Sequence, residues 1–146
     1  MDIRFALPEE INQIIALFER NLSRNNDALY SEEFFCPLGV KSAIRREHLV
    51  IAINNNNIIA AARFYKRKKQ KLISLYQFAI DASYRGKGLL LEMLKFICDT
   101  DILVLCPKTS SFNTYYRKTG WLLKDSDDKS NYWILPKEYF QTRKSI

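Results

Sequence analysis

The sequence predicts a mixed α/β fold with a central β-sheet, antiparallel early strands and helices on both faces. Apolar residues first recur at helical spacing, up to Phe18, and then change to runs typical of strands from Leu49 onward. Short polar turns separate the first three of these strands, as in β-hairpins. The predicted order is strand, two helices, three strands, helix, strand, helix and two strands.

The N-terminal third predicts one short strand and two helices. Residues 1–6 alternate loosely, as a strand does. Pro8 and the two acids after it suit the first turn of a helix, which apolar residues up to Phe18 continue. Residues 21–39 are expected to form an irregular helix and loop, and a second helix is expected over about 40–47.

The middle of the chain predicts three successive strands. Residues 49–53 and 58–65 form a hairpin around the asparagine turn at 54–57, whose residues tolerate positive φ. A second, charged turn follows at 66–71. The next strand, 72–80, has few polar residues and is expected to be buried on both faces.

The last third predicts two helices and three strands. A helix is expected from Gly88 to about Asp99, followed by a buried strand at 101–105. Another helix begins at about Ser110, with Ser110 or Ser111 as its cap, and ends at Gly120. Residues 121–124 and 132–135 are expected to form a closing hairpin, and residues 136–146 a polar tail.

Length and composition indicate one globular domain over residues 1–146. Apolar residues make up 47% of the chain and aromatic residues 13%, which is ample for a packed core. No apolar run is long enough to span a bilayer, and the first residues do not resemble a signal peptide. We therefore expect a cytoplasmic protein without a membrane partner; the sequence does not predict an oligomeric state.

Cysteine, histidine and charge limit the function classes. Cys36, Cys98 and Cys106 are widely spaced, and His48 is the only histidine, so neither a disulfide framework nor a metal site is expected. The formal charge of +7 suits an anionic ligand or partner. Charge alone does not choose between a phosphate-bearing cofactor and RNA.

The segment Arg85-Gly86-Lys87-Gly88 lies where a buried strand ends and an amphipathic helix begins. The first turn of a helix offers N–H groups without partners and the positive end of a dipole. Two glycines allow the backbone to approach a bulky anion, and the two cations add charge. The pattern predicts a phosphate site; the alternative is a glycine turn with solvated charges. It is neither a Walker loop nor a dinucleotide fingerprint.

Two segments resemble the GNAT superfamily of N-acetyltransferases. Residues 78–90 resemble its strand, loop and helix start with the motif [R/Q]-x-x-G-x-[G/A], and residues 115–121 resemble its later segment [F/Y]-Y-x-x-x-G-[F/W]. The resemblance covers about residues 49–124 in element order. Leu90 departs from it, since glycine or alanine is expected there. A leucine there either narrows the approach to the pyrophosphate, which would weaken binding, or points its side chain into the core. Its helical spacing with Met93 favours the core.

The resemblance implies acetyl-CoA as cofactor, no metal, and transfer of an acetyl group to a primary amine of a small molecule or protein. The backbone of residues 85–90 would hold the pyrophosphate. The end of strand 72–80 would separate from its neighbour, so that main-chain groups of Phe78 and Ile80 face the thioester and pantetheine. The cofactor-binding residues are then Phe78, Ala79, Ile80, Arg85, Gly86, Lys87, Gly88, Leu89 and Leu90.

The same resemblance implies that Tyr116 is the catalytic residue, which protonates the departing thiolate. The alternative is a tyrosine packed between helix and sheet, and Tyr115 is expected to point elsewhere. Thr109 or Ser110 falls near the place where the family often has an asparagine that contacts the cofactor. Asn113 does not align with that position.

No general base is assigned. Gln77 stands where the family often has a glutamate, and an amide cannot accept a proton usefully. The other candidates are more typical of solvated or structural side chains: Glu32, Glu33, Glu47 and His48. A covalent route through Cys106 would need an activating base, so a buried, inert thiol is the better interpretation.

The acceptor and two other functions stay open. The acceptor pocket is expected to involve residues 11–47 and an aromatic set, Tyr30, Phe34, Phe35 and Trp133. Six of the nine residues from Arg63 to Lys71 are basic; they form the solvated tip of a hairpin or dock RNA or an acidic protein. The alternatives are a non-catalytic acyl-CoA-binding module, suggested by Leu90 and Gln77, and an acetyltransferase acting on an RNA-linked amine.

Overall fold

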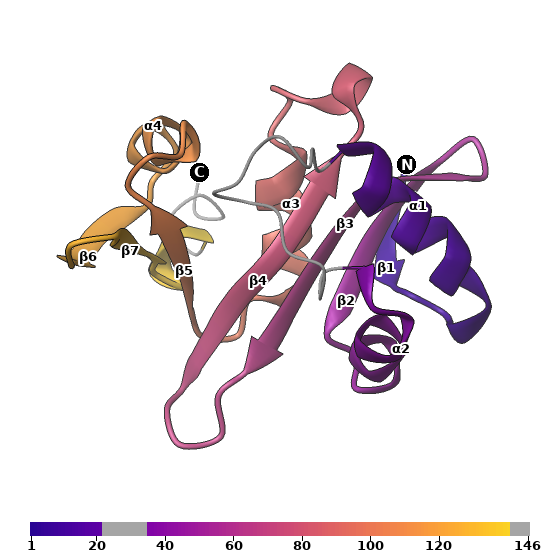
Figure 1. Cartoon of the computed structure of the whole chain (residues 1–146), viewed down its shortest axis with the longest axis horizontal. Coiled ribbons are helices and arrows are strands. Elements are labelled where there is room, and N and C mark those ends of the chain that lie inside the picture. The colour runs from indigo at the N-terminus through magenta and orange to yellow at the C-terminus, as the bar shows by residue number, and fades with distance from the viewer. Residues whose placement is uncertain (22–34, 141–146) are drawn as a thin grey trace. The chain divides into compact units, whose positions relative to one another are not determined.

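The structure is a computed structural model that describes residues 1–21 and 35–140. The chain divides into two compact units. The first unit contains Met1–Tyr65 and Tyr76–Ile97, and the second contains Lys66–Leu75 and Cys98–Ile146. The predicted order of strands and α-helices is confirmed throughout the described residues (Figure 1).

The first unit begins with a short strand, continues with two α-helices and further strands, and ends with a third α-helix. Its elements are β1 (Asp2–Phe5), the 3-10 helix η1 (Pro8–Glu10), α1 (Ile11–Asn21), α2 (Pro37–Arg45), β2 (Leu49–Asn54), β3 (Asn57–Lys66), the second part of β4 (Leu72–Ile80), the 3-10 helix η3 (Ala82–Tyr84) and α3 (Leu89–Ile97). β1 and β3 both pair antiparallel with β2. The asparagine turn is confirmed, because Asn55 and Asn56 adopt φ of 52° and 64°.

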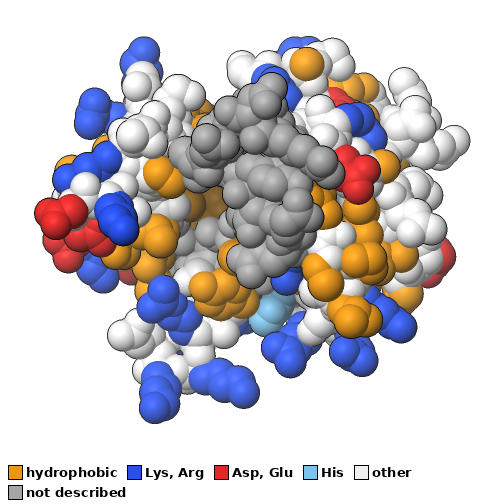
Figure 2. Space-filling model, viewed as in Figure 1, with side chains coloured by type: hydrophobic (Ala, Val, Ile, Leu, Met, Phe, Trp, Pro, Cys, Tyr) orange, Lys and Arg blue, Asp and Glu red, His pale blue; other side chains and the backbone are white. Residues whose placement is uncertain are grey.

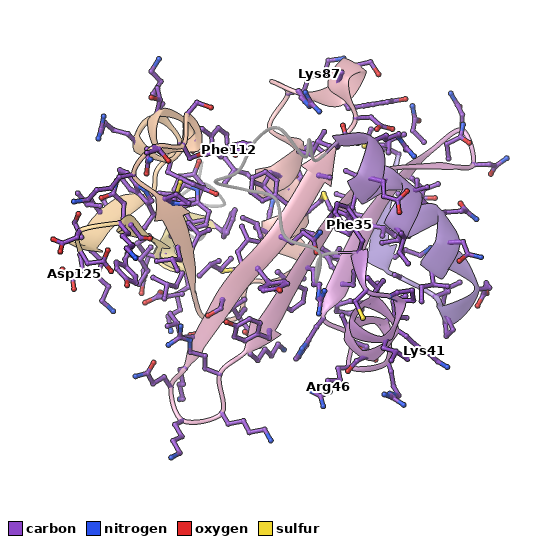
Figure 3. The ribbon with its side chains drawn as sticks, in the orientation of Figure 1. Phe35, Lys41, Arg46, Lys87, Phe112 and Asp125 are labelled. Atoms are coloured by element: carbon purple, nitrogen blue, oxygen red, sulfur yellow. The ribbon has the colours of Figure 1, made fainter. Side chains whose placement is uncertain are left out.

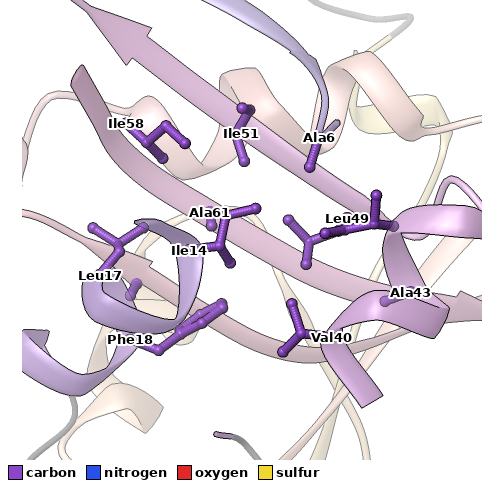
Figure 4. Close-up of a cluster of buried hydrophobic side chains, with 12 residues drawn as sticks. Ala6, Ile14, Leu17, Phe18, Val40, Ala43, Leu49, Ile51, Ile58 and Ala61 are labelled. Carbon is purple, nitrogen blue, oxygen red and sulfur yellow. The ribbon is translucent and has the colours of Figure 1, made fainter. Parts of the chain in front are cut away.

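The core of the first unit lies between these strands and α1 and α2. Ile14, Leu17 and Phe18 of α1 are fully buried, and they pack with Val40 of α2 and Leu49 of β2 (Figure 4). The third helix, α3, contacts β1 and β2. Helix α3 and strand β1 also meet through the rings of Phe96 and Phe5, at 5.2 Å between centroids. Figure 1 shows α3 behind the strands, opposite α1 and α2, so helices cover both faces as predicted.

Helix α2 begins three residues earlier than the sequence predicts. Pro37 occupies the start of the helix, where its missing N–H has no partner to lose. The helix also ends earlier, at Arg45. Glu47 then adopts a left-handed φ of 57°, and the N–H of His48 donates to the carbonyl of Ala43 at 2.8 Å. Glu47 therefore contributes a helix-terminating backbone conformation.

Besides the start of β4, the described elements of the second unit include β5 (Asp101–Pro107), α4 (Phe112–Lys118), β6 (Leu122–Ser126) and β7 (Ser130–Leu135). Leu72–Leu75 of β4 pairs in parallel with Asp101–Val104 of β5. β7 pairs antiparallel with both β5 and β6, so it lies between them. Hydrogen bonding thus orders the seven strands β1-β2-β3-β4-β5-β7-β6.

The prediction of a polar tail after Pro136 is wrong for its first part. Phe140 is buried, and the ring of Tyr139 lies against Gly120. Gly120 ends the preceding helical segment with φ of 91°, as expected for a helix stop. Aromatic packing therefore continues the second unit to residue 140, and residues 141–146 lie outside the described part of the chain.

Asp81, directly after β4, joins that strand to the end of α1. Its carboxylate accepts hydrogen bonds from Arg20 Nε at 2.9 Å and Arg20 Nη2 at 2.8 Å, and from Asn21 Nδ2 at 2.8 Å. Its backbone N–H donates to the Ile59 carbonyl at 2.9 Å. The Arg20 hydrogen bonds, helped by Asn21 and by the charge of Arg85, lower the pKa of Asp81. We call this arrangement the Asp81 anchor.

We predict that Asp81→Asn lowers the free energy of unfolding at neutral pH. The Arg20–Asp81 pair is partly exposed, with side-chain exposures of 48% and 25%, so the expected loss is about 1 kcal/mol. A lowered folded-state pKa makes the contribution complete above the ordinary value of 3.8. The contribution disappears as the pH falls from there through the folded-state pKa.

Urea unfolding of wild type and Asp81→Asn at neutral pH and below pH 3.8 measures this difference. Asp128→Asn, which changes an exposed carboxylate of the second unit, is the matched control and should leave stability unchanged. Equal stabilities of wild type and Asp81→Asn at neutral pH would contradict the role of the anchor.

Candidate active site

The loop 85–88 has the backbone conformation that only glycine adopts easily. Gly86 and Gly88 have φ of 74° and 77°. A Cβ at either position would meet no described atom within 4 Å. Backbone conformation, not crowding by neighbouring protein atoms, therefore requires glycine at both positions. The space beside these two α-carbons is open to a ligand.

Helix α3 begins directly after this loop. The N–H of Glu92 donates to the carbonyl of Gly88 at 3.1 Å, which closes the first turn. The N–H groups of residues 89–91 have no intrahelical acceptor, as at the start of any α-helix, and Gly88 has no side chain that could supply one. Leu90 is 3% exposed and packs with the buried Met93 side of α3. Its side chain points into the core, as predicted, and leaves the loop uncovered.

The two cations of the loop differ in their surroundings. Arg85 Nε donates to the Ile80 carbonyl and Arg85 Nη2 donates to Asn21 Oδ1, each at 2.7 Å. Arg85 therefore holds the loop against the end of β4 and the end of α1. Lys87 is exposed and projects from the loop, with Nζ 6.0 Å from the centre of the Tyr84 ring (Figure 3).

The predicted cofactor residues of β4 lie in the same unit as the loop. Ala79 is 4% exposed, and Phe78 and Ile80 are partly buried. Ile80 meets the loop through its carbonyl, which accepts from Arg85. The structure thus brings together residues 78–80 and 85–90 of the predicted set. The separation of the end of β4 from its neighbour stays a prediction.

Tyr116 belongs to the second unit and is buried in aromatic surroundings. It is 3% exposed, and its ring lies 5.1 Å from Trp121, 5.5 Å from Tyr115 and 6.1 Å from Trp133. Burial raises the pKa of Tyr116 far above its ordinary value, with smaller contributions from Cys106 and Tyr115. The phenol therefore stays protonated. These contacts also match the alternative of a packed tyrosine, and the proton-donor role stays a prediction.

Asn113 has a structural role that the sequence did not indicate. Its amide nitrogen donates to the carbonyls of Pro107 and Ser110, each at 2.9 Å. Its amide oxygen accepts from Trp133 Nε1 at 3.0 Å and from Asn131 Nδ2 at 3.1 Å. Asn113 therefore joins the start of α4 to β7. Only the tertiary structure reveals this set, because its partners come from three separate segments.

Two other expectations for the second unit meet different outcomes. Trp133 is 2% exposed, so the prediction that it lines an acceptor pocket is wrong. Its ring is instead part of the packing around Tyr116. Cys106 is buried, as expected, and burial raises the pKa of its thiol, which disfavours the reactive thiolate. Ser110 Oγ accepts from the N–H of Phe112 at 3.1 Å, as a residue near the start of α4 should.

The candidates for a general base remain scattered. Glu47 is exposed and ends a helix, and the ring of His48 lies 5.5 Å from that of Phe64. Gln77 is buried. Glu32 and Glu33, and the acceptor candidates Tyr30 and Phe34, lie outside the described residues. Within residues 1–21 and 35–140, no side chain has a geometry that identifies it as the base.

Metal and membrane features are not found in the described residues. Among residues 1–21 and 35–140, no group of three or more His, Cys, Asp or Glu side chains could hold a metal ion. No helix in the same ranges has the length and apolar character needed to cross a bilayer.

The basic turn 66–71 is exposed, and Figure 2 shows its Lys and Arg side chains projecting outward. Lys66 Nζ lies 3.5 Å from Asp99 Oδ2.

Solved structures with the same fold are acetyltransferases. This chain is similar to the PaiA N-acetyltransferase of Thermoplasma acidophilum, crystallised with coenzyme A, at 16% identity and a TM-score of 0.74, covering 92% of this chain and 98% of that one. It is also similar to the diaminobutyrate acetyltransferase EctA of Paenibacillus lautus, crystallised with L-2,4-diaminobutyric acid and coenzyme A. There the identity is 13% and the TM-score 0.66, with 93% and 95% of the two chains covered.

A third similar structure is the ribosomal-protein-S5-alanine acetyltransferase of Vibrio fischeri, at 14% identity and a TM-score of 0.64, covering 93% of this chain and 92% of that one. Such identities support the fold alone. No curated protein sequence matches significantly. The sequence model of the acetyltransferase (GNAT) family, however, matches residues 11–101, more than half of the chain. This chain belongs to the acetyltransferase (GNAT) family.

Proposed function

We propose that this chain is a single-domain N-acetyltransferase that transfers the acetyl group of acetyl-CoA to a primary amine. The observation that carries the proposal is the 85–88 loop, where two glycines of positive φ directly precede the start of α3. Family membership supports acetyl transfer in general. We also propose a cytoplasmic location, because Cys36, Cys98 and Cys106 are all free thiols.

The residues of the loop fit the phosphates of coenzyme A. The N–H groups of the first turn of α3 point out of the helix end, where the dipole favours an anion. The space beside Gly86 and Gly88 is open, and Lys87 is an exposed cation at the same place. Acetyl-CoA, when bound, supplies the acetyl group as a thioester that an amine can attack.

Each proposed role follows from the chemistry of the transfer. Backbone N–H groups of residues 85–90 hold the pyrophosphate, and main-chain groups of Phe78 and Ile80 orient the thioester end. The amine nitrogen bonds to the acetyl carbon as the C–S bond breaks. The Tyr116 hydroxyl donates its proton to the departing sulfur. The proton of the amine passes to water, since no base is identified, and the Tyr116 phenolate takes a proton back from water before the next turnover.

We predict that Gly88→Ala weakens acetyl-CoA binding about tenfold. An alanine at φ of 77° costs about 1–2 kcal/mol, so the backbone shifts away from the conformation that aims its N–H groups. Isothermal titration calorimetry with acetyl-CoA measures the change, and Ser83→Ala, an exposed change in η3, is the control. Unchanged affinity would contradict the role of the loop, and no binding by wild type would contradict the proposed function.

Acetyl transfer itself is tested with a panel of amines. Purified protein is incubated with acetyl-CoA and polyamines, amino acids, peptides with free N-termini, or aminoacyl-RNA, and release of the coenzyme A thiol is followed. We expect thiol release and an acetylated product with at least one class. Binding of acetyl-CoA without transfer to any class would instead favour the non-catalytic acyl-CoA-binding module.

We predict that Tyr116→Phe lowers kcat at least tenfold and leaves the affinity for acetyl-CoA unchanged. The change removes the hydroxyl that donates the proton, and general acid catalysis typically contributes about 100-fold or more. Steady-state kinetics with the best amine of the panel measures it. Tyr115→Phe, the same change on the neighbouring residue, should retain wild-type kcat. If Tyr116→Phe retains it as well, Tyr116 is only a packed side chain.

A further inference from the structure

Arg63 of β3 is a partly buried cation that forms no ion pair with the described residues 1–21 and 35–140. Its Nη1 is buried and has no hydrogen-bond partner within residues 1–21 and 35–140. The ion pairs formed in these ranges involve other cations, Arg4, Arg20 and Lys66. A buried guanidinium nitrogen without an acceptor is costly. Such a group is therefore a candidate for binding a ligand that brings the acceptor.

Two neighbours hold the guanidinium in place. Its central carbon lies 4.7 Å from the centre of the Tyr76 ring of β4, within the range of a cation–π contact. On the α2 side, a Cβ on Gly39 would lie 3.1 Å from Nη2 of Arg63. The ring face provides no conventional hydrogen-bond acceptor. The arrangement thus positions the guanidinium and leaves Nη1 unsatisfied.

Gly39, in the first turn of α2, leaves room for the guanidinium of Arg63. A glycine inside a helix destabilises a protein by about 0.5–1 kcal/mol relative to alanine. The contact with Arg63 gives the reason for it, since a side chain would crowd the guanidinium. The first turn of α2 has no acidic residue and no capping side chain, so nothing on that turn balances the cation. The dipole there favours an anion as well.

We propose that Arg63 binds a carboxylate of the acceptor, so that the acceptor is a small amine that also carries a carboxylate, as an amino acid does. This inference rests on the proposed acetyl transfer. Tyr76 lies two residues before Phe78 on β4, which corresponds to about 7 Å along a strand. One small molecule could therefore place its amine near Phe78 and its carboxylate near Tyr76.

The balance of charge favours a carboxylate over a phosphate. Arg63 carries one positive charge, and its planar fork of N–H donors matches the two oxygens of a carboxylate. A phosphate monoester carries about 1.5 to 2 negative charges at neutral pH, which a single guanidinium does not neutralise. The part of the Arg63 side chain that is exposed gives a ligand access to the guanidinium.

The test compares matched amines and matched variants. Each standard amino acid is paired with its decarboxylated amine and its carboxamide, and both acetyl transfer and binding are measured, the latter by calorimetry in the presence of coenzyme A. Wild type should prefer the carboxylate form of at least one amino acid tenfold or more. Arg63→Met should raise KM and Kd for that amino acid about tenfold to 100-fold, with kcat for the decarboxylated amine unchanged.

Stability separates a binding role from a structural one. Arg63→Met keeps the length of the side chain and removes an unpaired charge, so its Tm should equal or exceed that of wild type. A clear fall in Tm with an unchanged carboxylate preference would overturn the inference. Lys41→Gln, which removes an exposed charge from α2 (Figure 3), is the control and should retain the preference.

The outcomes distinguish this inference from the proposed function. Transfer to decarboxylated amines with no preference for the carboxylate form would overturn the inference and keep the acetyltransferase. Binding of amino acids that depends on Arg63, without transfer to any amine, would overturn the proposed function and support the carboxylate site. If the protein neither binds nor acetylates any amine that carries a carboxylate, the inference is overturned. A preference for amines that carry a phosphate in place of the carboxylate would overturn it as well.

Discussion

The Asp81 anchor is the interaction on which the candidate cofactor loop depends. A loop that binds an anion through backbone N–H groups must hold its conformation before the anion arrives, because ordering it afterwards would weaken binding. Asp81 receives three hydrogen bonds from the end of α1, and Arg85 adds two from the loop. The lowered pKa of Asp81 keeps its carboxylate ionised to a more acidic pH than that of an ordinary aspartate. The start of α3 is therefore fixed from two sides.

Local patterns in the sequence predicted the elements, and contacts between distant residues were beyond them. Glycine and asparagine turns were predictable because the required backbone conformation depends on the residue itself, as at Asn55 and Gly86. The Arg20–Asp81 pair joins residues 61 positions apart, and the place of β7 between β5 and β6 depends on register. A single sequence carries no local signal for either. Trp133 was misplaced for the same reason, because its partner Asn113 is also distant.

The predicted cofactor loop and the predicted proton donor differ in how far the fold alone explains their residues. The glycines of the loop have no structural explanation other than their φ angles. Tyr116, in contrast, already has a sufficient explanation in its aromatic neighbours. Its raised pKa makes it a weaker acid, while a free thiol has an ordinary pKa near 8.5. Desolvation raises the pKa of a thiol as well, so proton donation by Tyr116 is favourable only where the pKa of the departing thiol is raised at least as far as that of Tyr116.

Residues that break a local rule show where function has to be sought, provided that the fold does not already explain them. Gly120 has positive φ, and the Tyr139 ring against it is a structural cause. Gly86 and Gly88 face open space. Arg63 and Gly39 are a third case. Gly39 leaves room for the guanidinium of Arg63, but Nη1 of Arg63 still has no hydrogen-bond partner among the described residues. Natural proteins tend to break such local rules at functional sites. A ligand that brings one negative charge to Arg63 supplies the missing reason.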